Sequence, residues 1–309
     1  MKEASLILNK IDKAIKNPKL LLLFLLNSNY SMIIPDALFL KLKYKLITGK
    51  KLNLKNPKSF NEKLQWLKLH DRKPEYTRLV DKYEVRKYIA ETIGAEYLIP
   101  LLGVYNSFQE IDFERLPNQF VLKPNHTSGD IFICNDKSMI NYSELENTIN
   151  RWLKREYYWV HREWPYKDVK PKIICEKLMV DESGKELKDY KFMCFNGRVK
   201  CSFVCLNRFS PQGLNVDFYD IDWNPMPFER HYPRSGTILP KPKNYEKMIE
   251  LAEILSQNIP FLRVDFYDIN GRIYFGELTF YPGSGFEEFT PEDYDYILGS
   301  WLKLPIENK

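Results

Sequence analysis

The chain has 309 residues, of which 44% are hydrophobic and 15% aromatic, and its formal net charge is +5. This composition is typical of a folded globular protein and excludes a disordered one, and the length suggests about two domains. Residues 20–26 form an apolar run of only seven residues, too short to span a bilayer and without the flanks of a cleaved signal. Five cysteines without a Cys-x-x-Cys pair favour free thiols in a cytoplasmic protein.

The N-terminal segment, residues 1–56, is expected to be basic and helical. Residues 1–60 carry twelve Lys against three Asp or Glu, so the basic charge is concentrated there. Leu38, Leu42 and Leu46 form a helical stripe that ends before Gly49. The pattern fits a peripheral helix on the inner, anionic face of a membrane, and equally a helix that packs its stripe on the main domain.

The rest of the chain, residues 57–305, alternates between helix and strand patterns. Ser59 and Glu62 have capping-box spacing, and helices are expected over residues 77–93, 142–158 and 245–258. Strands are expected over residues 103–108, 119–125 and 172–180, and a hairpin turns at Asn196-Gly197. Two Asn-Gly turns indicate antiparallel sheets, so the predicted fold class is α+β.

Residues 262–285 are the most informative stretch, because they predict two apolar strands that each carry an acid. Asp265 lies on the first strand and Glu277 on the second. Buried carboxylates are costly unless a cation meets them, and Arg263 alone cannot satisfy both. A divalent metal ion is the natural candidate, and surface acids on a half-exposed hairpin are the alternative.

The loop length decides whether these two acids share a face. A two-residue Asn270-Gly271 loop would pair Asp265 with Gly276 and turn Glu277 to the opposite face. We therefore expect an odd loop over residues 269–271 with Gly271 left-handed. The face with the acids would then carry Arg263, Asp265, Phe275, Glu277 and Thr279. The core face would carry Val264, Phe266, Tyr274 and Leu278.

A second feature is a strand with Lys123 that runs into the small polar loop of residues 125–129. A lysine at a strand end reaches a phosphate as a point charge, and a Ser-Gly loop brings backbone N–H groups near phosphate oxygens. The spacing matches no Walker or Rossmann pattern, so the loop alone is a weak signal. Lys82 supplies a further cation upstream.

Taken in order, these motifs resemble the ATP-grasp superfamily, and the wider chain resembles its TupA-like branch. The stretches that carry the resemblance are NPKSFNEKLQWLKLHDR, YLIPLLGVY, FVLKPNHTSG, REWPYK and DYKFMCFNGR. The resemblance implies that a nucleotide binds between two antiparallel-sheet lobes that follow an N-terminal helical extension. The smaller lid lobe would span about residues 113–182 and the metal-binding lobe about residues 183–305.

The resemblance also implies roles for individual residues, with ATP and Mg²⁺ as cofactors. Catalytic roles fall to Arg263 and Lys123. The expected ATP contacts are Lys82, Lys123, Ser128, Gly129, Asp189, Lys191 and the adenine hinge at Glu176, Lys177 and Leu178. The expected metal ligands are Asp265, Glu277 and Thr279, with Thr279 where the ligases have Asn. Independently of the resemblance, the predicted loops offer candidates for substrate contact, each of which could equally have a structural role: His126, Arg208, His231, Arg234, Arg162 and Trp164.

The implied activity is that of a carboxylate–amine ligase that forms an amide through an acyl-phosphate. The TupA-like resemblance suggests a uronic acid and an amino acid or small amine, joined in capsule or other surface polysaccharide synthesis, with no nucleic acid partner. A metal-dependent glycosyltransferase is the alternative, because Asp220-Ile-Asp222 and Asp293-Tyr-Asp295 match Asp-x-Asp. A non-catalytic basic scaffold would leave the acidic hairpin unexplained.

Overall fold

The computed structural model describes residues 18–181, 187–208, 210 and 213–305. The part of the expected N-terminal segment before residue 18 lies outside the described residues. None of the described helices is long and apolar enough to cross a membrane. All five cysteines are buried and unpaired, as expected for free thiols.

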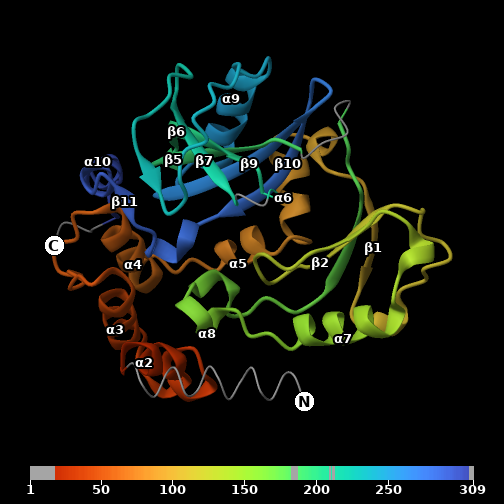
Figure 1. Cartoon of the computed structure of the whole chain (residues 1–309), viewed down its shortest axis with the longest axis horizontal. Coiled ribbons are helices and arrows are strands. Elements are labelled where there is room, and N and C mark those ends of the chain that lie inside the picture. The colour runs from red at the N-terminus through yellow and green to blue at the C-terminus, as the bar shows by residue number, and fades with distance from the viewer. Residues whose placement is uncertain (1–17, 182–186, 209, 211–212, 306–309) are drawn as a thin grey trace.

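Two antiparallel sheets form the body of the molecule, which confirms the predicted α+β class (Figure 1). The four-stranded sheet has the order β1-β4-β2-β3, with β1 at Leu101–Tyr105, β2 at Phe120–Pro124, β3 at Phe132–Cys134 and β4 at Ile173–Lys177. The five-stranded sheet has the order β10-β9-β5-β6-β7, with β5 at Asp189–Phe195, β6 at Arg198–Leu206, β7 at Asn215–Asp220, β9 at Phe261–Ile269 and β10 at Arg272–Thr279. The first sheet begins at β1, upstream of the boundary expected near residue 113.

Helices cover these sheets. Helix α7 (Tyr142–Leu153) packs against β2, and α9 (Tyr245–Leu255) packs against β5, β6 and β9. Both helices end earlier than the sequence indicates. The expected helix over residues 77–93 is broken into α5 (Glu75–Val80) and α6 (Val85–Thr92). The break arises because the Asp81 carboxylate accepts hydrogen bonds from the backbone of Tyr83 and Glu84, a local turn that competes with the helix.

The N-terminal helices are α2 (Pro18–Leu26) and α3 (Asp36–Thr48), and α3 packs on the main body. Helix α3 buries Phe39, Leu40 and Tyr44 in a cluster that also contains Phe286. Helix α4 (Phe60–His70) follows and begins with the predicted Ser59 capping box. Short elements complete the described chain: η1 (Asn29–Ile33), η2 (Ala95–Tyr97), η3 (Phe108–Glu110), η4 (Lys137–Met139), α8 (Tyr158–His161), η5 (Trp164–Tyr166), β8 (Glu229–Arg230), η6 (Pro282–Gly285), β11 (Phe289–Thr290) and α10 (Asp293–Trp301).

The β9–β10 hairpin closes with two residues, so the prediction of an odd loop is wrong. Asn270 and Gly271 both have positive φ, and Ile269 pairs with Arg272. A bulge at Gly276 then shifts the register, because Phe275 pairs with Phe266 while Glu277 pairs with Asp265. The bulge therefore restores the predicted shared face of the two acids.

The two-residue loop also corrects two side-chain assignments. Phe275 is buried on the core face with Phe266, whereas Tyr274 pairs with Tyr267 on the other face, the reverse of the expectation. A Cβ on Gly276 would lie 3.1 Å from the backbone oxygen of Asp265 and 3.3 Å from the Tyr267 ring. Glycine thus permits the close approach that the bulge requires.

Candidate functional site

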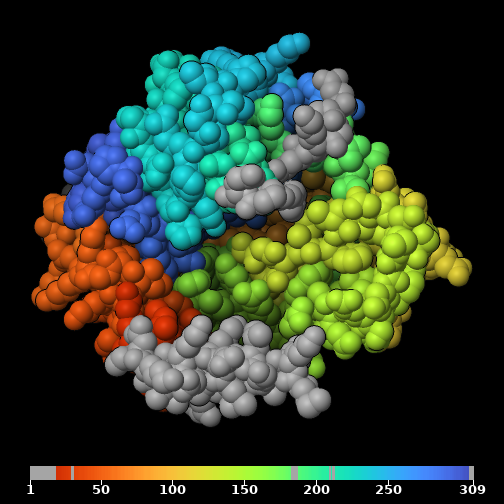
Figure 2. Space-filling model, in the orientation of Figure 1, coloured from red at the N-terminus to blue at the C-terminus, as the bar shows by residue number. Residues whose placement is uncertain are grey.

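A cleft between the two sheets gathers most of the predicted site residues, and Figure 2 shows the hollow between the yellow-green lobe and the cyan and blue lobe. Its volume of about 280 Å³ is near the lower limit of roughly 300–1,000 Å³ for small-molecule sites. The predicted residues that line it are Lys82, Lys123, Ser128, Gly129, Asp189, Lys191, Arg208, Asp265 and Glu277. A narrower recess continues from it past Glu176, Leu79, Leu98, Phe275 and Leu278.

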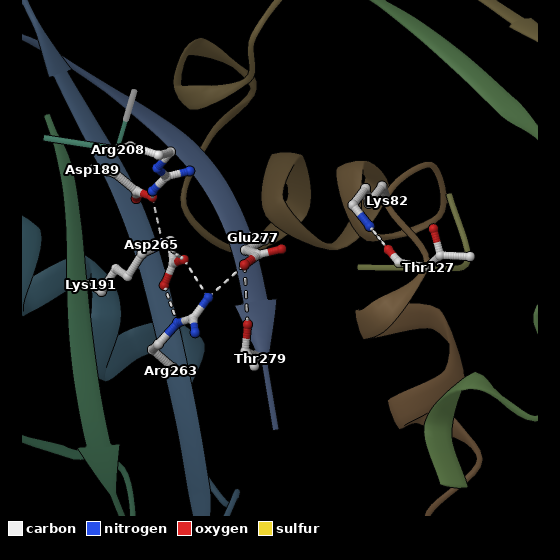
Figure 3. A network of polar contacts seen from close by, with 9 residues as sticks. All are labelled: Lys82, Thr127, Asp189, Lys191, Arg208, Arg263, Asp265, Glu277 and Thr279. Carbon is white, nitrogen blue, oxygen red and sulfur yellow. Dashed lines mark hydrogen bonds and ion pairs between the residues drawn. The ribbon is translucent and has the colours of Figure 1, made fainter. Parts of the chain in front are cut away.

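Arg263 joins the two acids of the hairpin (Figure 3). Its Nε and Nη2 donate to Asp265 Oδ1 and Oδ2, both at 2.7 Å, and Nη2 also donates to Glu277 Oε1 at 2.5 Å. Lys191 Nζ adds a second ion pair to Asp265 Oδ2. The expectation that one arginine cannot satisfy both acids is therefore only half right: Arg263 reaches both, and Lys191 supplies the additional positive charge.

The electrostatics of the two carboxylates differ because their burial differs. The Glu277 side chain keeps 36% exposure; burial would raise its pKa, but Arg263, Lys191 and Lys82 lower it to about 2. The side chain of Asp265 is 2% exposed, and its burial raises its pKa against the opposing effect of Arg263 and Lys191. Glu277 is thus the acid of the pair that is open to the cleft and fully charged at neutral pH.

Lys191 lies between two acids on the floor of the cleft. It contacts Asp189 Oδ2 at 2.5 Å as well as Asp265, and these charges raise its pKa although burial opposes them. Arg208 Nη2 lies 3.4 Å from the same Asp189 oxygen. The five-stranded sheet therefore presents alternating charges to the cleft.

The opposite wall is cationic. Lys82, in the break between α5 and α6, donates to the backbone oxygen of Thr127, and burial together with nearby Lys123 lowers its pKa (Figure 3). Lys123 Nζ lies 2.7 Å from Glu176 Oε2, whose other oxygen lies 3.1 Å from Arg86 Nη1. Two lysines thus face Glu277 across the cleft.

The carboxylate and hydroxyl oxygens at this site are of the kind that Mg²⁺ prefers as ligands. Mg²⁺ in phosphate-transfer sites commonly takes one or two carboxylates and completes its shell with substrate phosphates and water. Asp265 and Glu277 supply those carboxylates, and Thr279 Oγ1 lies 3.4 Å from Glu277 Oε1. No group of three or more His, Cys, Asp or Glu side chains that could hold a metal alone occurs in the described residues.

Several predicted residues lie elsewhere. His126 is buried, with Nδ1 3.3 Å from Asn125 Oδ1 and Nε2 3.1 Å from the Arg155 oxygen, and it does not line the cleft. Arg162 is fully buried against Asp36 and Ser31. Glu176 lines the recess but not the cleft, and the remaining predicted residues that do not line the cleft in the described chain are Trp164, Lys177, Leu178, His231, Arg234, Arg263 and Thr279.

Neither Asp-x-Asp match forms a metal site. Asp220 Oδ1 accepts hydrogen bonds from the backbone of Asp222 at 2.9 Å and Asn224 at 2.8 Å, which is a turn. Asp295 is buried against Asn61, whereas Asp293 is exposed. The structure thus gives no support to the glycosyltransferase alternative.

Sequence reasoning missed the residues that hold η6, the turn after β10. Gly283, Ser284 and Gly285 all have positive φ, a conformation that is strained for serine. Gln65 Nε2 and Lys68 Nζ from α4 donate to the Ser284 oxygen at 3.0 and 2.8 Å. Ser284 Oγ donates to buried Glu163 at 2.5 Å. The available signal was a lysine within the apolar stripe of α4.

Comparisons with known proteins agree with the sequence motifs. The model of the TupA-like ATPgrasp family matches residues 62–303. No curated protein matches the chain. Similar solved structures include D-alanine–D-alanine ligases from Bacillus anthracis (15% identity, 65% of this chain and 54% of that one, TM-score 0.38) and Helicobacter pylori (12%, 74% and 59%, 0.39). A RimK domain ATP-grasp protein from Sphaerobacter thermophilus has 9% identity, coverage of 74% and 69%, and a TM-score of 0.40.

The chain thus spans little more than half the length of the two ligases. The family match covers most of the chain and includes α4, the strand with Lys123, and the β9–β10 hairpin. The protein belongs to the TupA-like ATP-grasp family.

Proposed function

We propose that the protein is an ATP- and Mg²⁺-dependent ligase that joins a carboxylate to an amine. The observation that carries the proposal is that one cleft gathers these residues, with Lys82 and Lys123 facing Glu277 and with Asp265 beside it. Cations opposite carboxylates suit a phosphate chain whose negative charge is shared between lysines and a bound metal ion. Family membership supports ATP as the nucleotide.

In this proposal Lys82, Lys123 and the Ser128-Gly129 backbone contact the phosphates, and Asp189 contacts the ribose. Glu277 and Asp265 hold Mg²⁺, which when bound neutralises charge on the transferring phosphoryl group. The backbone of residues 176–178 meets the adenine. Arg263 touches both metal-binding carboxylates and fixes their orientation.

The reaction would proceed in two steps, phosphorylation of the carboxylate and attack by the amine. A carboxylate oxygen of the substrate bonds to the γ-phosphorus of ATP, and ADP leaves with the electrons of the broken bond. The amine nitrogen then bonds to the acyl carbon, phosphate leaves, and the nitrogen loses a proton. A uronic acid with an amino acid or small amine, in surface polysaccharide synthesis, is the substrate pair we propose by analogy with the family.

Coupled ADP release, screened over uronates and amines, tests the proposal. We expect turnover that needs both substrates and Mg²⁺, and its loss in Glu277→Gln. Asp293→Asn, a change of an exposed acid outside the cleft, should keep turnover within about twofold of wild type. Thermal stabilisation by a UDP-sugar but not by Mg·ATP would instead support the glycosyltransferase.

We further propose that α2 contacts an anionic membrane surface from the cytoplasmic side. Its apolar side chains are 37–53% exposed at Leu20, Leu21, Leu22, Phe24 and Leu25. A helix that is apolar on nearly every side needs an apolar partner, and the twelve lysines in the sequence of residues 1–60 favour acidic head groups. Flotation with anionic liposomes should carry the wild-type protein but not a Phe24→Ser, Leu25→Ser variant; equal flotation of both would refute the contact.

A further inference from the structure

A second cavity lies between α3 and the segment from Gly283 to Asp295. Its volume of about 420 Å³ falls within the range of small-molecule sites and exceeds that of the cleft. The turn η6 forms part of its wall through Gly283, and η6 follows the strand that carries Glu277. Strand β10 and the turn η6 therefore connect the cleft with the cavity.

Asp295 is the buried charge on the wall of this cavity. It is 6% exposed, and its oxygens accept hydrogen bonds from the backbone nitrogen of Asn61 at 2.9 Å and from Asn61 Nδ2 at 3.2 Å. Among the described residues no lysine, arginine or histidine forms an ion pair with it. Neutral donors compensate only part of the cost of burying a carboxylate, and burial raises its pKa despite them.

The other groups of the cavity reduce this deficit only in part: a hydrogen bond from Ser59 and the charge of Lys50, which forms no ion pair with Asp295 among the described residues, oppose the effect of burial on the pKa of Asp295. Glu287 pairs with Arg230 at 2.7 Å, and Glu292 pairs with Lys50 at 2.7 Å. Glu288 at the rim has no ion-pair partner within the described chain. In the described residues the cavity therefore has two carboxylates without an ion-pair partner, one buried and one exposed, and it favours a cationic ligand.

The other residues that line the cavity indicate the character of the rest of the ligand. His161 Nδ1 is buried and has no hydrogen-bond partner among the described residues, and burial with nearby Lys43 and Lys68 lowers the pKa of His161 to about 2. Because Lys43 and Lys68 are cations near His161, this end of the cavity disfavours a cationic group and suits the apolar part of a ligand. The His161 ring lies 5.5 Å from that of Phe286, which together with Ile47 forms an apolar wall.

We propose that this cavity binds a primary amine with an apolar body, whose ammonium group lies beside Asp295 and Glu288 and whose apolar body lies toward Phe286 and Ile47. The binding itself is independent of the reaction, but its assignment as the amine substrate rests on the proposed ligase function. Nucleophilic attack requires a neutral amine, so the carboxylates would also be the local proton acceptors when the ammonium is released toward the cleft.

Calorimetric titration of the full chain with 2-phenylethylamine and with 2-phenylethanol tests the proposal. We expect saturable binding of the amine and at least about tenfold weaker binding of the alcohol. Asp295→Asn should weaken amine binding about tenfold, whereas Asp293→Asn, an exposed acid of the same helix, should change it less than about twofold. Ile47→Trp, at an exposed rim position, should block both ligands.

Three results would overturn it: no saturable amine binding, equal binding of amine and alcohol, or binding unchanged by Asp295→Asn and Ile47→Trp. Thermal unfolding checks that each variant is folded. If Asp295→Asn does not fold, the effect of Ile47→Trp on amine binding tests the proposal instead. Titration of the same samples with Mg·ATP separates the two proposals. ATP binding without amine binding contradicts the cavity alone, and amine binding without ATP binding contradicts the ligase alone.

Discussion

Arg263→Met removes the guanidinium that joins the two acids of the hairpin. The change deletes contacts of 2.7, 2.7 and 2.5 Å and leaves Asp265, whose side chain is 2% exposed, with Lys191 as its neighbouring cation. Removing one partner of a buried ion pair lowers the free energy of unfolding by about 3–5 kcal/mol. Because Lys191 still contacts Asp265, we expect a loss of about 3 kcal/mol for Arg263→Met. At about 2–4 °C per kcal/mol the midpoint of thermal unfolding should fall by about 6–12 °C.

Differential scanning calorimetry measures this shift, with Arg198→Met as the matched control. Arg198 is 74% exposed and lies 2.7 Å from Glu253, so its loss should cost about 0–1 kcal/mol. Arg263→Met combined with Asp265→Leu should recover part of the lost stability, because the second change removes the carboxylate that the first leaves undercompensated. Equal shifts for the two single variants, or no recovery in the double variant, would refute the reasoning.

Two further outcomes follow from the site. The pKa of Glu277 is lowered to about 2 in the folded protein, whereas a glutamate in an unfolded chain has a pKa of about 4.3. The charged Glu277 therefore stabilises the fold fully above a pH of about 4.3, and this stabilisation is lost as the pH falls toward 2. Urea unfolding should therefore show a gap between wild type and Glu277→Gln at pH 6 that narrows at pH 3; a constant gap would contradict this. Gly283→Ala, whose Cβ would overlap Glu287, should destabilise more than Gly49→Ala, which has the same left-handed backbone and no atom within 4 Å; equal losses would show that Glu287 simply moves aside.

The sequence was sufficient for the elements whose signals are local. The capping box at Ser59, the turn at Asn196-Gly197 and the strand with Lys123 all appear as predicted. The shared face of Asp265 and Glu277 was also predicted, although for the wrong reason.

The remaining features depend on tertiary contacts that a single sequence does not display. The hairpin register is set by the bulge at Gly276, and a lone glycine inside a strand was the only local sign of it. The role of Lys68 depends on η6, more than 200 residues away, which no periodicity in α4 can indicate. His126 resembled a loop donor, but it is buried, and its ring nitrogens lie beside oxygen acceptors of Asn125 and Arg155 rather than in the cleft.

Calorimetric titration of the full chain with Mg·ATP tests the central claim most directly. We predict saturable binding that weakens about tenfold or more in Lys123→Met, because a charge-assisted phosphate contact is lost, while the exposed Lys200→Met stays within about twofold of wild type. Absence of binding at millimolar Mg·ATP, or equal affinities for wild type and Lys123→Met, would contradict the assignment of this cleft as the nucleotide site.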